Sequence, residues 1–127
     1  MTSTPESPFI LAVEDDDGIR ETLRIMLEYE GYRVLTANNG REGLEVLSRH
    51  PKPCLILLDL MMPEMDGWTF AEELGKSEVF SSLPIVVVTA FPNKSVGIEK
   101  ISDVVSKPFD FERLIRIVQQ HCPKGCS

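Results

Sequence analysis

The stretch CLILLD, residues 54–59, consists of apolar side chains followed by a single acid, Asp59. Strands that are buried on both faces of a parallel sheet have this continuous hydrophobic character. In parallel sheets of α/β proteins, ligands bind outside the carboxyl ends of the strands. The stretch therefore predicts a central strand that presents Asp59 at the binding edge of such a sheet.

Three further apolar runs also end in residues whose side chains can bind an ion or a phosphoryl group. Residues 9–13 are followed by Glu14 and Asp15, residues 85–88 by Thr89, and residues 104–105, through Ser106, by Lys107. If all four runs are parallel strands, these side chains should meet Asp59 at one edge of the sheet. Three carboxylates, a hydroxyl and an ammonium group would together suit a divalent cation and a phosphoryl group.

Helical and strand-like patterns alternate along the chain. Helices are predicted from Asp16 to before Gly31, at 41–49, at 68–76, as a short and weak helix within 93–101, and after Asp110. Strands are predicted at 9–13, 32–36, 54–58 and 85–88, with a brief last strand that ends at residue 106. This order predicts an α/β fold with a doubly wound parallel sheet and helices on both faces.

Size and composition narrow the possible functions. The 127 residues correspond to one domain, and a net charge of −7 argues against direct nucleic-acid binding. No apolar stretch approaches the ~20 residues that a membrane helix needs. The three cysteines suggest no disulfide framework, because Cys54 falls in a predicted strand while Cys122 and Cys126 fall in what we expect to be an exposed tail. A reducing, cytoplasmic location fits this pattern.

The chemistry-bearing motifs together resemble a known family. They are VEDD at residues 13–16, LLDLMMP at 57–63 with Asp66-Gly67, VTA at 88–90, and SKPF at 106–109. In type and spacing, this set is similar to the receiver domain of two-component response regulators, of the chemotaxis-regulator-like kind. The likeness extends from about Phe9 to His121.

The resemblance implies a fold and domain boundaries. The fold would be a flavodoxin-like (βα)5 three-layer sandwich with a five-stranded parallel sheet in the order 2-1-3-4-5. Residues 1–8 would form a flexible tail, residues 9–121 the receiver domain, and residues 122–127 a C-terminal tail. We expect a stand-alone regulator or an excised receiver whose output lies in other chains, with a downstream effector that the resemblance does not specify.

The resemblance also implies a role for each site residue. Asp59 would accept a phosphoryl group from a phosphohistidine of a sensor histidine kinase or histidine phosphotransfer protein. Glu14, Asp15 and Asp59, with the Met61 main-chain carbonyl, would bind Mg²⁺. Thr89 and Lys107 would contact the bound phosphoryl group. The domain would promote its own phosphorylation and slow autodephosphorylation without being an enzyme in the usual sense. The family's lysine-proline bond, here Lys107-Pro108, is often cis.

One departure from the family concerns signal output. The family usually has Tyr or Phe three residues before the lysine, as a ring that follows the state of the threonine hydroxyl. This chain has Val104 there, which is too small and stiff for that motion. Thr89 and Lys107 are 18 positions apart, about one helical turn fewer than usual, so the fourth helix should be short or irregular. We expect output through another face or through a rearrangement between Ala90 and Ser102.

Two bulky apolar residues bear on the lifetime of the phosphorylated state. Met61 and Phe91 lie two positions after Asp59 and Thr89, where side chains influence the approach of the hydrolytic water in this family. We expect them to hinder that water and to give a long-lived acyl phosphate. Glu14, in place of the commoner aspartate, is a conservative change.

Two alternatives to phosphoacceptor function are compatible with an aspartate at a strand end. A phosphatase of the haloacid dehalogenase type would have a second aspartate two residues after the nucleophile, where this chain has Met61. A degenerate receiver, a protein-binding module that works without phosphorylation, would account for Val104 and the short fourth helix. The intact set of Asp15, Asp59, Thr89 and Lys107 argues against it.

Overall fold

The computed structural model describes residues 9–50, 52–62, 64–90 and 101–122. Their five strands form one parallel sheet in the order β2-β1-β3-β4-β5, which confirms the predicted topology. The strands are β1 (Phe9–Val13), β2 (Arg33–Ala37), β3 (Leu55–Leu58), β4 (Ile85–Thr89) and β5 (Ile101–Ser106). The central strands β1, β3 and β4 are buried along their whole length, as their continuous apolar sequences predict.

Four helices lie within the described residues, and each begins after a side chain that caps its first turn. They are α1 (Asp17–Tyr29), α2 (Gly40–Arg49), α3 (Gly67–Gly75) and α4 (Phe111–His121). The capping residues Asp16, Asn39, Asp66 and Asp110 each accept a hydrogen bond from a backbone amide two or three residues ahead. Caps of this kind satisfy amide groups that have no partner inside the helix. None of these helices is long and apolar enough to span a membrane.

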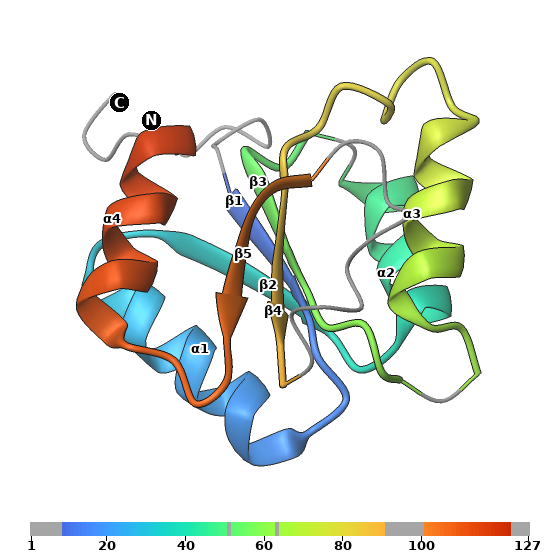
Figure 1. Ribbon diagram of the computed structural model, residues 1–127. Coiled ribbons are helices and arrows are strands. Elements are labelled where there is room, and N and C mark those ends of the chain that lie inside the picture. Colours follow the sequence, from blue (N-terminus) through green and yellow to red (C-terminus); the bar gives the residue numbers. More distant parts are fainter. Residues whose placement is uncertain (1–8, 51, 63, 91–100, 123–127) are drawn as a thin grey trace.

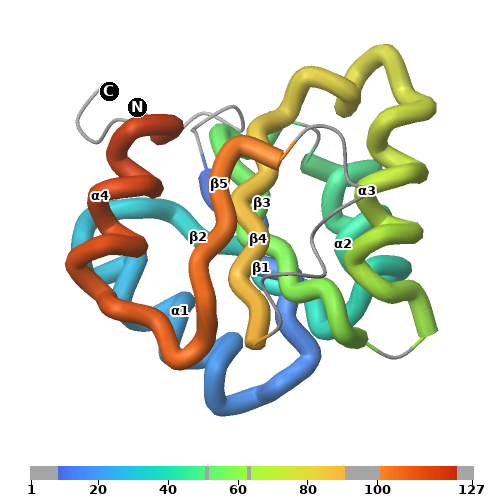
Figure 2. The backbone as a smooth tube through the Cα atoms, viewed as in Figure 1, coloured from blue at the N-terminus to red at the C-terminus, as the bar shows by residue number. Residues whose placement is uncertain are grey.

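The sheet is the middle of three layers, with α1 and α4 on one face and α2 and α3 on the other (Figure 1). Successive strand residues alternate between two hydrophobic clusters, so that Ile10 and Leu57 belong to one and Leu11 and Ile56 to the other. The backbone tube in Figure 2 shows the strands packed between the two helical layers. Both faces of the sheet are therefore covered, as a doubly wound fold requires.

The last strand differs from its prediction. It was expected to be brief, but β5 extends over six residues and begins at Ile101, the residue at which the weak fourth helix was expected to end. Its pairing with β4 shifts by one residue, because Ile85 faces Ile101 while Val86 faces Asp103. The rest of that expected helix, residues 93–100, lies outside the described residues.

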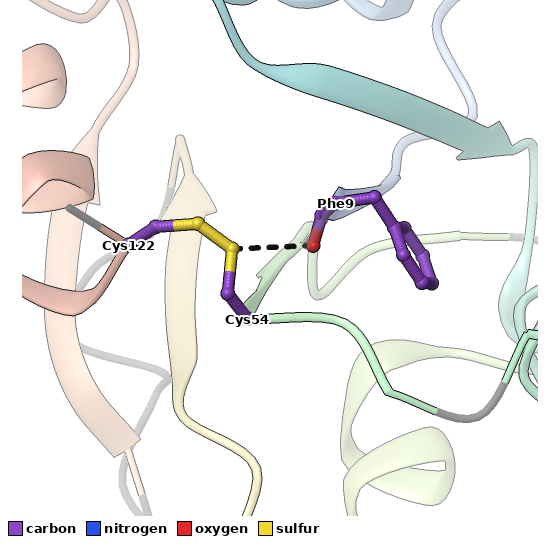
Figure 3. The surroundings of a disulfide bond; sticks show 3 residues. All are labelled: Phe9, Cys54 and Cys122. Carbon is purple, nitrogen blue, oxygen red and sulfur yellow. Dashed lines mark hydrogen bonds between the residues drawn. A yellow bond between two sulfur atoms is a disulfide. The ribbon is translucent and has the colours of Figure 1, made fainter. Parts of the chain in front are cut away.

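A disulfide bond between Cys54 and Cys122 corrects the expectation that the cysteines form no bridge (Figure 3). Cys54 directly precedes β3, and Cys122 caps the end of α4, with their Cα atoms 5.5 Å apart. Cys122 is buried, so the interpretation of this residue as part of an exposed tail is wrong. The Cys54 sulfur also lies 3.3 Å from the Phe9 carbonyl oxygen, an acceptor within reach if the bond is reduced to thiols.

Reduction of the Cys54–Cys122 bond should lower the free energy of unfolding. The cysteines are 68 residues apart, and the loop-entropy relation gives up to about 4 kcal/mol for a loop of this length. Urea unfolding with and without a reductant measures the loss. Cys126→Ser keeps both bonded cysteines and should respond like the parent, whereas Cys54→Ser should be insensitive to the reductant. Identical midpoints for the parent in both conditions would contradict the prediction.

Candidate functional site

The strand ends bring the predicted site residues to one edge of the sheet. Glu14 directly follows β1, Asp59 directly follows β3, Thr89 ends β4, and Lys107 directly follows β5. Backbone bonds between neighbouring strands hold these positions: the Asp59 amide donates to the Val13 carbonyl at 3.0 Å, and the Lys107 amide donates to the Thr89 carbonyl at 2.8 Å. The backbone register of the parallel sheet therefore brings these side chains together, whatever contacts the side chains then make with one another.

Lys107 is the cation at the centre of the cluster. Its Nζ atom lies 2.8 Å from Glu14 Oε1 and 3.5 Å from Asp59 Oδ2. The Glu14 side chain is 2% exposed, the Asp59 side chain 6% and the Lys107 side chain 15%. Two carboxylates thus share one ammonium group in a setting with little water, where charges interact strongly.

The surroundings of all three groups shift their pKa values. Burial raises the pKa of the Glu14 carboxyl from 4.5 to about 7, and the charge of Asp59 adds to the rise while Lys107 opposes it. Burial also raises the pKa of Asp59, again against the effect of Lys107. The pKa of Lys107 is raised as well, because its interactions with Glu14 and Asp59 outweigh its own burial. One ammonium group therefore does not compensate both carboxylates fully.

The acidic residues fit a hard divalent cation. Within the described part of the chain, Glu14, Asp15 and Asp59 each offer a carboxylate oxygen, and these oxygens lie within 4.8 Å of one another. Asp15 is exposed, whereas the other two are buried, so the cluster opens to solvent on one side. Burial raises the pKa of Glu14 and Asp59 despite the nearby Lys107, and an oxygen-bound Mg²⁺ would stabilise their charged forms.

The loop after Asp59 is held by close backbone packing. The Met61 amide donates to Asp59 Oδ1 at 3.4 Å, and the Gly67 amide donates to the Leu60 carbonyl at 2.9 Å. A Cβ atom on Gly67 would lie 2.6 Å from the Asp59 carbonyl oxygen, closer than real Cβ atoms come. The loop is also tied to α2, because the Gly40 amide donates to the Met65 carbonyl at 3.1 Å.

The structure describes only some of the residues that we expect to take part in signal output. Thr89 is fully buried, and Val104 is partly buried and packs against the hydrophobic cluster on the α2 and α3 side of the sheet. Arg113 of α4 donates to the Val104 carbonyl at 3.3 Å. Phe91 and most of the segment between Ala90 and Ser102 lie outside the described residues. The Lys107-Pro108 peptide bond is cis, as the resemblance implied.

One contact at the site was missed by reasoning from the sequence. Arg20, in the second turn of α1, folds back so that its Nη1 atom donates to the Glu14 carbonyl at 3.0 Å. The Asp15 carbonyl lies 3.5 Å from the same atom. A basic residue one turn into the helix that follows an acid pair was the available signal, but it does not by itself distinguish this contact from a surface ion pair.

Comparisons with known proteins agree on one family. The family model described as the response regulator receiver domain matches residues 10–119. The sensor histidine kinase CheAY of Helicobacter pylori is 37% identical over 123 residues, which cover 93% of this chain and 15% of that protein. An uncharacterized 14.6 kDa protein of Leptolyngbya boryana is 40% identical over 120 residues, 89% of this chain and 88% of that protein.

Solved structures show the same relationship. The response regulator TrrA of Thermotoga maritima, solved in complex with Mg²⁺ and BeF, superposes with a TM-score of 0.79 at 32% identity, covering 90% of this chain and 98% of that one. The chain spans about half the length of several matching regulators, such as 47% of MprA from Mycobacterium leprae. It thus corresponds to one module of these longer proteins.

Without metal, the free energy of unfolding should fall as the pH rises from about 4.5 to about 7. The folded state keeps a proton on Glu14 in this window, whereas the unfolded chain releases it, so the loss reaches about 3 kcal/mol at most. Urea unfolding at several pH values in EDTA measures the slope. Glu14→Gln should reduce the slope to the part that Asp59 contributes, while Glu45→Gln, which removes a charge from the exposed side of α2, should not change it. If the free energy of unfolding of the parent protein does not change over this pH range, this account is contradicted.

Substitution of two glycines of α3 should have opposite effects. Gly67→Ala should destabilise the protein by about 1–3 kcal/mol, because the added Cβ meets backbone atoms of Asp59 and Leu60. Gly75→Ala, at the other end of the same helix, meets nothing within 4 Å and should stabilise by up to about 1 kcal/mol. Urea unfolding of both variants tests the pair. Changes of the same sign and size would show that the packing at Gly67 is not constraining.

Proposed function

The chain belongs to the response regulator receiver domain family, and on that premise we propose that Asp59 accepts a phosphoryl group from a phosphohistidine in a Mg²⁺-dependent reaction. The observation that carries the proposal is the position of Asp59, buried at a strand end beside Lys107 and within reach of Glu14 and Asp15. Receiver domains are signalling domains and generally not enzymes. Phosphorylation would switch the partner interactions of this one.

The transfer exchanges one bond to phosphorus for another. A carboxylate oxygen of Asp59 forms the new bond, the nitrogen-phosphorus bond of the phosphohistidine breaks, and the imidazole keeps the electron pair and takes up a proton. Catalysis of such a step depends on positioning and on neutralising charge on the phosphoryl oxygens. Lys107 would contribute its ammonium group to one oxygen, and the Thr89 hydroxyl would donate a hydrogen bond to another.

Four groups of this chain would hold Mg²⁺. They are the carboxylates of Glu14, Asp15 and Asp59 and the main-chain carbonyl of Met61, of which the three carboxylates cluster. Bound there, the ion would neutralise charge on the carboxylates and on the incoming phosphoryl oxygens. The similar response regulator TrrA was solved in complex with Mg²⁺ and BeF, which supports Mg²⁺ binding by this chain.

The phosphorylated state should be long-lived, with slow autodephosphorylation. Met61 lies two residues after the phosphoacceptor, and its apolar side chain is 47% exposed. A side chain there can shield the acyl phosphate from water without offering a group that activates it. Slow loss of the phosphoryl group would suit a regulator whose output depends on a lasting change of partner.

We place the receiver domain at residues 9–121, with the buried Cys122 bonded to it, and its action in the cytoplasm, where reduction would leave Cys54 and Cys122 as thiols. Its phosphodonor would be a sensor histidine kinase or a histidine phosphotransfer protein, in keeping with the kinase among its relatives. With a net charge of −7, its own surface is unsuited to direct nucleic-acid binding. The downstream effector would therefore be a protein, or another module of the same chain.

The alternatives receive less support. A degenerate receiver has no need of an ammonium group held 2.8 Å from one buried acid and 3.5 Å from another, and this chain keeps both contacts. A phosphatase of the haloacid dehalogenase type would have an acid at position 61, where this chain has methionine. The phosphoacceptor proposal uses every charged group of the buried cluster.

Incubation with acetyl phosphate and Mg²⁺ should add one phosphoryl group to the parent protein, read by intact mass. Asp59→Asn keeps the shape of the side chain but removes the nucleophile, and should remain unmodified. Asp66→Asn lies in the same loop, keeps a capping side chain for α3, and should be modified like the parent. Equal modification of the Asp59→Asn variant and the parent would refute Asp59 as the phosphoacceptor.

A further inference from the structure

Arg20 joins the start of α1 to the loop that carries the two acids after β1. The last paired residue of β1 is Val13, so Glu14 and Asp15 lie just beyond the sheet ladder. The Nη1 atom of Arg20 donates to the Glu14 carbonyl at 3.0 Å and lies 3.5 Å from the Asp15 carbonyl. The other terminal nitrogen, Nη2, pairs with the Asp17 carboxylate.

This arrangement uses the planar shape of the guanidinium group. One terminal nitrogen faces the backbone carbonyls of the acid pair, while the other is oriented by Asp17 on the same helix. The Arg20 side chain is 21% exposed, so most of it is withdrawn from water. A planar fork with donors on both arms holds two partners in fixed directions, which a lysine ammonium group on its flexible stem does not.

Other contacts hold the Glu14 side chain and the end of the acid loop, because Lys107 pairs with the Glu14 carboxylate at 2.8 Å and Asp16 caps α1 through the Ile19 amide. The Glu14 amide donates to the Ala37 carbonyl of β2 at 3.0 Å, and the Asp16 amide donates to the Glu14 side chain at 3.2 Å. These bonds hold the amide side and the side chain of Glu14, whereas Arg20 holds the carbonyl side. The orientation of the peptide unit between Glu14 and Asp15 therefore depends on Arg20. This orientation in turn sets the direction of the Asp15 carboxylate.

We propose that Arg20 is a positioning residue for Mg²⁺ binding, acting through the main-chain carbonyls of Glu14 and Asp15. The proposal rests on the proposed function, because it assigns Arg20 a part in the metal site of that function. Residues that orient metal ligands commonly change metal affinity 10-fold or more when they are lost. Arg20 orients the backbone of two ligands, so we expect an effect of about tenfold.

A simple charge effect would act in the opposite direction. Arg20 is positive and lies beside a site for a cation, so removing its charge would by itself strengthen Mg²⁺ binding. Pairing with Asp17 reduces this repulsion. The direction of the change in affinity therefore distinguishes positioning, which predicts weaker binding, from electrostatics, which predicts tighter binding.

Calorimetric titration of Mg²⁺ into the metal-free protein tests the proposal with three variants. Arg20→Gln should raise the dissociation constant about tenfold, and Arg20→Lys, which keeps the charge but not the fork, should raise it by less. Arg24→Gln is the matched control. It removes the same charge from the next turn of α1, where Arg24 pairs with Glu21 and Glu28, and should leave the affinity unchanged.

Urea unfolding in EDTA separates positioning from a general loss of stability. If Arg20→Gln and Arg24→Gln are destabilised alike but only Arg20→Gln binds Mg²⁺ more weakly, the proposal stands. If Arg20→Gln does not fold, a weakened affinity in Arg20→Lys carries the same conclusion. Parent affinity or tighter binding in the Arg20 variants would overturn the inference alone. A parent protein that binds no Mg²⁺ would overturn the proposed function together with it.

Discussion

The parallel register of the sheet is the constraint on which the site depends. In a parallel sheet, neighbouring strands run in the same direction, so residues just past their carboxyl ends must meet at one edge. Backbone bonds between β1 and β3 and between β4 and β5 set this register with no help from the charged side chains. The free energy needed to bring Glu14, Asp59 and Lys107 together therefore comes from the apolar strands, which bury their side chains on both faces.

Features that follow from strand endings could be predicted from the sequence, whereas features that depend on distant contacts could not. Asp59 and Lys107 were found because each follows an apolar run. The bond between Cys54 and Cys122 joins positions 68 residues apart, and only the folded chain shows that the end of α4 lies beside the start of β3. The contact of Arg20 depends on a rotamer that turns the side chain back toward its own loop.

The misjudged length of β5 has a different origin. Its first residues include the polar Ser102 and Asp103, which lie outside the apolar run 104–105 that indicated the strand. They are tolerated because β5 is an edge strand, which is only partly buried. A strand in the middle of the sheet could not carry Asp103 without a buried partner, whereas here its carboxylate lies 3.6 Å from Arg113 Nη2. A continuous apolar sequence thus identifies central strands but not an edge strand such as β5.

The disulfide closes a covalent loop in the chain that its linear sequence does not suggest. Residues 54–122 form a closed ring that contains Asp59, Thr89 and Lys107, while Glu14 and Asp15 lie on an open arm outside it. A protease that cuts once inside the ring leaves a single molecule, which separates into fragments only after reduction. A single cut between Asp15 and Cys54 instead divides the acid pair from the phosphoacceptor at once. The two halves of the site therefore differ in what holds them after cleavage: a covalent bond on one side, and packing alone on the other.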